Sequence, residues 1–148
     1  MMRRVILLVI VAALAVPELK AQEGLSISRL FDGRYKKETN AVEVLVKGKK
    51  LEPYKLSLFR SLTVKDAPEE FEQIEKLVTA DAQQALDKET GMIGGKLYYG
   101  FYHLPPKNDQ YRYLFFRNSS LRKVEANEVT VVYMEGHTTL EELKKMFK

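Results

Sequence analysis

The chain has 148 residues, no cysteine and a formal net charge of +4 at pH 7. Without cysteine it has no disulfide, no thiol nucleophile and no cysteine-ligated metal site. Three basic residues and one acidic residue among the first 21 carry +2 of the charge, so the remaining 127 residues carry about +2, with both signs interspersed. That balance lacks the strong basic excess typical of nucleic-acid-binding proteins, and we expect no nucleic-acid partner.

Residues 1–21 have the three-part build of a secretory signal peptide. Arg3 and Arg4 form a basic head, residues 5–16 are an unbroken apolar run, and Ala21 offers a small residue for cleavage. The run is shorter than the ~20 residues that a membrane-spanning helix needs, so a retained membrane helix is the weaker alternative. We expect cleavage after Ala21, export to the periplasm or cell envelope, and no stable membrane insertion afterwards.

Residues 22–148 are long enough for one domain with a hydrophobic core, and their first half predicts a short helix followed by two strands. The apolar spacing over Leu25–Asp32 is helical, with a glycine directly after it. Residues 42–46 have the alternation of a half-buried strand. Residues 54–64 alternate as well, but Arg60 falls on the apolar side, so we expect a bulge or a change of partner near it.

The second half predicts a long helix, three strands and a short final helix. Residues 66–91 carry an apolar stripe at helical spacing and end in a glycine, where the helix is expected to stop. Residues 96–104 and 110–117 are rich in aromatic residues and are separated by the turn-forming sequence "PPKND". A β-branched strand follows at residues 129–134, and the last helix begins with a capping box at Thr139.

The predicted order of elements is therefore αββαβββα. Adjacent strands joined by short connections favour antiparallel pairing. We expect a single α+β domain over residues 22–148, with one mostly antiparallel sheet of about five strands and the helices packed on one face.

Two segments stand out near the ends of the chain: "ISRLFDGRY" followed by "AVEVLVKG", and "VTVVYMEGHTTLEELKKMF" near the C-terminus. In these segments the chain resembles the small exported proteins of unknown function that are common in Bacteroidetes. The resemblance implies an α+β fold and residence in the periplasm or envelope of a Gram-negative bacterium. It implies no reaction and no binding residues.

The sequence carries no recognisable catalytic, metal or cofactor motif. His103 and His137 lie too far apart for a metal-binding pair on one helix. No G-x-S-x-G or S-x-x-K motif occurs, and the glycine-rich "GMIGG" leads into a predicted strand, whereas a phosphate loop precedes a helix. We therefore predict no catalytic residues, no metal and no cofactor.

A small envelope hydrolase that acts on glycan or peptidoglycan fragments is the alternative function. It would need two carboxylates that face each other across a cleft. Such a pair could come from acidic residues at the ends of predicted elements, namely Asp32, Glu43, Asp109 and Glu135.

Residues 94–118 hold eight of the fifteen aromatic residues and supply the candidate binding site. Strand alternation places one aromatic set on one side, interpreted as core: Tyr99, Phe101, Tyr111, Tyr113 and Phe115. The opposite side is predicted to bind a partner through Tyr98, Tyr102, Arg112 and Phe116.

Gly100, which lies between the two tyrosines of the binding set, is expected to let a ligand or another backbone approach closely. The function predicted from this arrangement is a non-enzymatic, exported binding or interaction domain with an unknown protein or glycan partner. Coverage of the same side by helices or by a second subunit stays open, as does the oligomeric state.

Overall fold

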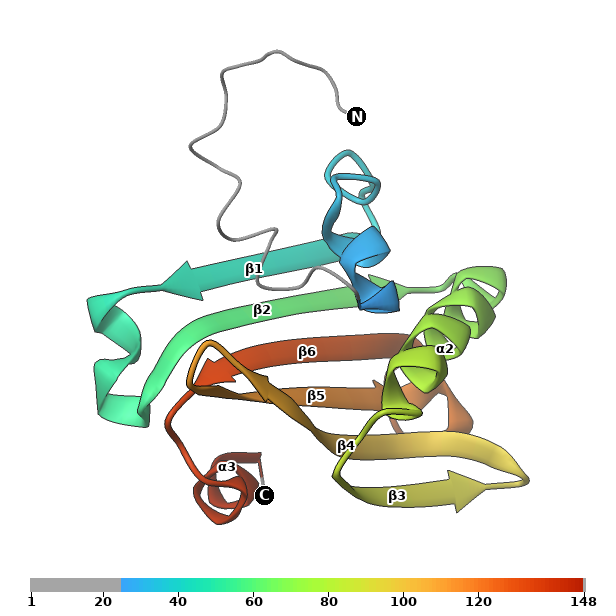
Figure 1. Cartoon of the computed structure of the whole chain (residues 1–148). Coiled ribbons are helices and arrows are strands. Elements are labelled where there is room, and N and C mark those ends of the chain that lie inside the picture. The colour runs from blue at the N-terminus through green and yellow to red at the C-terminus, as the bar shows by residue number, and fades with distance from the viewer. Residues whose placement is uncertain (1–24, 148) are drawn as a thin grey trace.

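The computed structural model describes residues 25–147, and the predicted signal peptide lies outside that range. Six strands form one sheet in the order β1-β2-β6-β5-β4-β3, and every neighbouring pair is antiparallel (Figure 1). The elements, with η for 3₁₀-helices, are η2 (Ser26–Phe31), β1 (Ala41–Lys47), η3 (Lys49–Tyr54), β2 (Leu56–Lys65), α2 (Pro68–Ala82), β3 (Asp87–Ile93), β4 (Lys96–Lys107), β5 (Gln110–Asn118), η4 (Ser119–Leu121), β6 (Glu128–Gly136) and α3 (Leu140–Phe147).

The α+β class and the antiparallel pairing are confirmed, whereas the predicted number of strands and the predicted end of the long helix are wrong. Helix α2 stops at Ala82, and residues 87–93 form β3, an additional edge strand beside β4. The residues of β3 are mostly exposed and polar, so their pattern favours neither structure by itself. Pairing with β4 makes these residues a strand, because strand formation depends on cross-strand neighbours more than on intrinsic preference.

The irregularity expected near Arg60 lies between Leu56 and Leu58, where β2 shifts register against β6. Arg60 itself does not interrupt the strand, because every second side chain from Leu56 to Val64 is buried, Arg60 included. The Arg60 guanidinium donates to the carbonyl oxygen of Phe31 at 3.2 Å, and its Cζ lies 4.8 Å from the centre of the Phe31 ring. Helix η2 thus provides both a hydrogen-bond acceptor and a cation–π partner for a buried cation.

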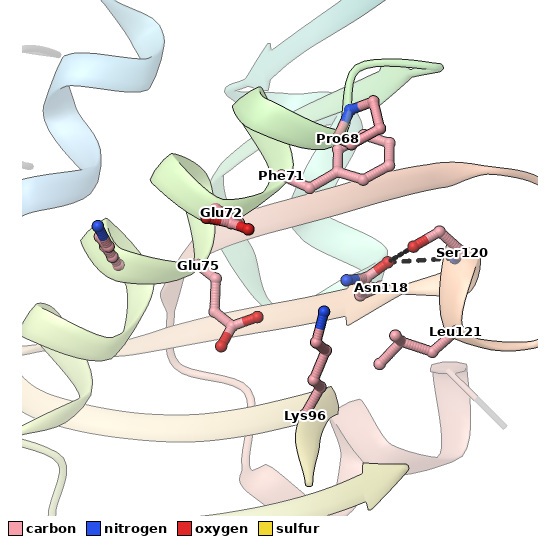
Figure 2. A pocket seen from close by; sticks show the side chains of 9 residues that line it. Pro68, Phe71, Glu72, Glu75, Lys96, Asn118, Ser120 and Leu121 are labelled. Atoms are coloured by element: carbon pink, nitrogen blue, oxygen red, sulfur yellow. Dashed lines mark hydrogen bonds between the residues drawn. The ribbon is translucent and has the colours of Figure 1, made fainter. Parts of the chain in front are cut away.

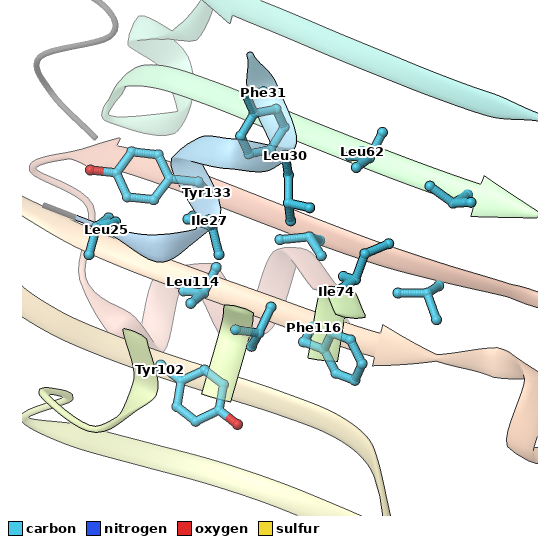
Figure 3. Packing of buried hydrophobic residues seen from close by; sticks show 14 of the residues in the cluster. Leu25, Ile27, Leu30, Phe31, Leu62, Ile74, Tyr102, Leu114, Phe116 and Tyr133 are labelled. Atoms are coloured by element: carbon cyan, nitrogen blue, oxygen red, sulfur yellow. The ribbon is translucent and has the colours of Figure 1, made fainter. Parts of the chain in front are cut away.

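One face of the sheet, here called the α2 face, is covered by η2 and α2 (Figure 1). Figure 3 shows the resulting core, in which Ile27 and Leu30 of η2 lie over the sheet and Ile74 of α2 lies close to Phe116 of β5. All four of these side chains are fully buried. Each contributes about 1.5–3 kcal/mol of stability relative to exposure, so this face holds the main core.

The opposite face, here called the α3 face, is covered in part by α3, so the expectation that helices pack on one face only is wrong. Leu143 of α3 is fully buried and belongs to a second core cluster with Phe101, Tyr113 and two residues of β6. The predicted capping box is confirmed: the Thr139 backbone N–H donates to Oε1 of Glu142 at 3.1 Å, and the Glu142 N–H donates to Oγ1 of Thr139 at 3.2 Å. Because α3 has only eight residues, it leaves parts of this face open.

Two buried tyrosines predict a loss of stability in alkaline solution. Burial raises the pKa of Tyr35 and of Tyr113 from 10.0 to about 12, and the hydrogen bond that Tyr35 donates to Glu70 adds to its shift. A raised folded-state pKa stabilises the fold below pH 10, and this contribution is lost as the pH rises through about 12.

We expect the urea concentration at the unfolding midpoint to decrease as the pH rises from 10 to 12. The decrease should be less steep in Tyr113→Phe, because phenylalanine cannot ionise. Urea unfolding followed by circular dichroism at closely spaced pH values measures how steeply the midpoint decreases in each protein. Equal slopes in the two proteins would contradict the assignment to Tyr113.

Candidate binding site

Three of the four residues predicted to bind a partner lie inside the protein. Tyr102 and Phe116 are 4% and 0% exposed and belong to the core of the α2 face (Figure 3). Arg112 is 7% exposed, and its Nε donates to the carbonyl oxygen of Pro105 at 2.8 Å. Helices therefore cover this side, which was one of the alternatives left open.

Gly100 accommodates a side chain of its own strand. A Cβ built at Gly100 would lie 2.3 Å from the hydroxyl oxygen of Tyr102, so the tyrosine ring rests directly on the glycine backbone. The close approach that was expected at this glycine is therefore made by Tyr102, and it fixes that ring in the core.

Tyr98, the fourth predicted residue, is moved to the other face by a bulge in β4. Gly91 pairs with Tyr99 and Met92 pairs with Leu97, which leaves Tyr98 without a partner in β3. Such an extra residue reverses the alternation of side chains. As a result Leu97 is buried in the core of the α2 face, and Tyr98 lies beside Tyr99, with ring centres 6.2 Å apart.

An aromatic hollow of ≈ 190 Å³ opens beside this bulge and is the candidate binding site. Residues of β3, β4, β5 and α3 line it, and we call this set the aromatic hollow: Glu89, Tyr98, Tyr99, Phe101, Phe115, Arg117 and Lys144. Phe101 and Phe115 pack edge to face with centres 5.9 Å apart. Tyr99 and Phe115 are half-buried, which gives the hollow an apolar surface that a ligand can reach.

Tyr98 is held in place by charged residues of β5 and of the loop after η4. Its hydroxyl donates to Oε2 of Glu125 at 2.7 Å and accepts from Nη2 of Arg117 at 2.7 Å. The guanidinium groups of Arg117 and Arg122 lie 5.2 and 5.1 Å from the centre of the ring, within cation–π range. Hydrogen bonds from Arg117 and Tyr98 lower the pKa of Glu125, so this carboxylate stays charged in mildly acidic solution.

An ion pair lies at the opposite edge of the aromatic hollow. Nζ of Lys144 in α3 lies 2.7 Å from Oε1 of Glu89 in β3, and this contact raises the pKa of Lys144. The hollow therefore combines aromatic walls with an ion pair at each edge, Arg117 with Glu125 at 2.8 Å and Lys144 with Glu89 at 2.7 Å. This arrangement can receive a flat ring and bind polar groups on its periphery.

The expectation that the odd-numbered set forms the core is correct for two of its members. Phe101 and Tyr113 are buried, whereas Tyr99 and Phe115 are half-buried and Tyr111 is 42% exposed. The less covered side of this hairpin is therefore the α3 face, which is the side interpreted as core from the sequence.

A second, more polar groove of ≈ 350 Å³ lies between α2 and the start of β4 (Figure 2). Glu72 and Glu75 enter it from α2, and Lys96 faces them. Burial raises the pKa of Glu75, Lys96 lowers it and Glu72 raises it. Both carboxylates stand on one wall, one turn apart, whereas glycoside hydrolysis needs them on either side of the bond.

The acidic residues suggested for a hydrolase have other surroundings. Glu135 accepts a hydrogen bond from the Tyr133 hydroxyl at 2.5 Å, and Asp32 accepts one from the Arg34 N–H at 3.1 Å. Asp109 lies in the turn between β4 and β5, and Glu43 lies in β1. Within residues 25–147, no group of three or more His, Asp or Glu side chains is placed to hold a metal ion, and no helix is long and apolar enough to cross a membrane.

The fold and the hollow define this protein as a six-stranded antiparallel α+β domain with an aromatic ligand-sized recess. The chain belongs to a family of unknown function, DUF6108, whose family model matches residues 14–147. No curated protein matches it. No solved structure matches it either.

Proposed function

We propose that this protein is an exported, non-enzymatic binding domain of the periplasm or cell envelope, and that it receives one ring of a glycan or protein partner in the aromatic hollow. The observation that carries the proposal is the set of reachable aromatic side chains that lie between two ion pairs. A ligand site of this kind needs an apolar recess with a few polar groups that fix orientation.

The size of the hollow favours a single ring. A cavity of about 150 Å³ accommodates benzene in another protein, so ≈ 190 Å³ suits one sugar ring or one aromatic side chain. Arg117 and Lys144 would bind hydroxyl, carbonyl or anionic groups of that ring. Because Tyr98 is already fixed by Arg117 and Glu125, little conformational entropy is lost on binding.

The proposed location is supported by the start of the chain. The basic head and the short apolar run of residues 1–21 are typical of a signal peptide. The resemblance to exported Bacteroidetes proteins points to the same compartment of a Gram-negative bacterium. N-terminal sequencing of the protein recovered from the envelope fraction should begin at Gln22, and an intact Met1 would contradict export with cleavage.

Replacing Tyr98 by alanine is expected to weaken partner binding at least tenfold, because it removes one aromatic wall and the anchor of Arg117. Immobilised protein would be exposed to envelope extract, and the captured glycan or protein would be identified by mass spectrometry. Its affinity would then be measured by isothermal titration calorimetry against the wild type and the variant.

The matched control is Tyr111→Ala, because Tyr111 is an exposed tyrosine of β5 outside the aromatic hollow. The control should retain affinity within about twofold, and both variants should unfold at nearly the wild-type temperature. Equal capture by the wild type and both variants would contradict the proposed site. If none of the three proteins captures a partner, the binding function itself is contradicted.

A further inference from the structure

The two edges of the sheet differ in how they are protected against pairing. Strand β3 begins with Asp87, Lys88 and Glu89 and faces a bulge in β4, features by which natural sheets discourage edge-to-edge association. Strand β1 at the other edge pairs with β2 without a register shift and places its two charged residues, Glu43 and Lys47, among exposed apolar ones. Val42, Val44 and Leu45 are 56%, 41% and 44% exposed, and no strand pairs with its outer side in the described part of the chain.

The backbone of β1 determines which residues a new strand would meet. The Lys65 N–H donates to the carbonyl oxygen of Asn40 at 2.8 Å, which makes these two residues a hydrogen-bonded pair of the β1–β2 ladder. In an antiparallel ladder such pairs alternate, so Val42, Val44 and Val46 bond to β2. Glu43, Leu45 and Lys47 therefore direct their N–H and C=O groups outward.

We propose that β1 pairs antiparallel with β1 of a second copy of this chain, centred on Leu45. Two-fold symmetry then places Leu45 opposite Leu45 and Glu43 opposite Lys47 of the other copy, at both ends of the contact. On the α3 face, Val44 meets Val46. The strand is thus complementary to itself in backbone, charge and apolar side chains.

Charge selects this register over its neighbours. If one β1 strand slides along the other, the hydrogen bonds form again only where residues with outward N–H and C=O groups lie opposite each other. One such shift places Glu43 opposite Leu45, and the other places it opposite Lys49, which lies beyond the turn at Gly48. Only the register centred on Leu45 therefore places each Glu43 opposite a lysine of strand β1 itself.

Charge reversal tests the register directly. Glu43→Lys places two lysines opposite each other, and Lys47→Glu places two glutamates opposite each other, so each variant should dimerise about tenfold more weakly than the wild type. An equimolar mixture of the two variants brings opposite charges together again and should form a heterodimer. The double variant Glu43→Lys, Lys47→Glu should regain the wild-type dimer. Sedimentation equilibrium over a concentration series measures the dimer affinity of the two single variants, of their mixture and of the double variant.

A pair of proline variants separates association from folding. Leu45→Pro removes an outward N–H, so it should remain folded by circular dichroism and become monomeric. Val44→Pro removes a ladder hydrogen bond to β2 and should destabilise the fold. A wild-type monomer up to about 1 mM would overturn the proposal. So would a dimer unaffected by the charge reversals, or binding of another protein's strand with no self-association.

Discussion

Replacing Phe116 by alanine is expected to lower the free energy of unfolding by about 3–5 kcal/mol. The Phe116 ring is fully buried in the α2-face core, where Figure 3 shows it beside Ile74 of α2. Its neighbours in the adjacent strands are Gly100 and Val131. Gly100 has no side chain that could fill the space, and Val131 is itself fully buried, so truncation leaves a cavity. Urea unfolding followed by circular dichroism measures the change.

Tyr111→Ala on the same strand is the control, because that side chain is 42% exposed, and about 1 kcal/mol or less should be lost. The sequence alone predicts that Phe116 binds a partner, so the comparison also decides between two roles. A stable Phe116→Ala protein that loses its partner would restore the binding role and contradict the core role derived from the structure.

The elements that sequence reasoning predicts correctly are those defined by local signals. The final helix begins where a Thr-x-x-Glu capping box predicts it, and both hydrogen bonds of that box form. The hairpin of β4 and β5 turns at Asn108 and Asp109, which both have positive φ, as turn residues of their type tolerate. Such signals act within a few residues and need no knowledge of the rest of the fold.

The errors arise where distant segments decide the structure. A strict alternation could not show that β4 has one residue more than β3 at Tyr98, because a bulge depends on both strands. Residues 87–93 pair with β4 although their own sequence is polar and exposed. Arg60 is accepted on a buried side because η2, almost thirty residues earlier in the chain, provides its partners.

The candidate site could be predicted only in part for the same reason. The aromatic stretch is identified by its composition, and Tyr98 does line the hollow. Glu89 and Lys144 are missed, because they meet only when α3 docks beside β3. Arg117 follows directly after the aromatic run of β5, and its position beside Tyr98 depends on the antiparallel pairing of the two strands.

Replacing Asp81 by alanine should release η2 from the body of the protein and lower the free energy of unfolding by about 2–5 kcal/mol. The carboxylate of Asp81 is 2% exposed near the end of α2 and accepts the backbone N–H groups of Ser26 and Ile27 at 2.5 and 2.8 Å. Alanine leaves both donors without an acceptor in a buried setting. Asparagine keeps one acceptor oxygen, so Asp81→Asn should lose roughly half as much.

Hydrogen exchange distinguishes this local release from a general loss of stability. Exchange at the Ser26 and Ile27 amides should rise more in Asp81→Ala than exchange in the central strand β6, because η2 opens before the sheet does. Glu72→Ala on the exposed side of α2 is the control and should change stability by about 0.5 kcal/mol or less. Equal exchange in η2 of the wild type and Asp81→Ala would contradict the anchoring role. If the role holds, one buried carboxylate fastens η2 over the core, and with it the carbonyl and ring that keep Arg60 buried.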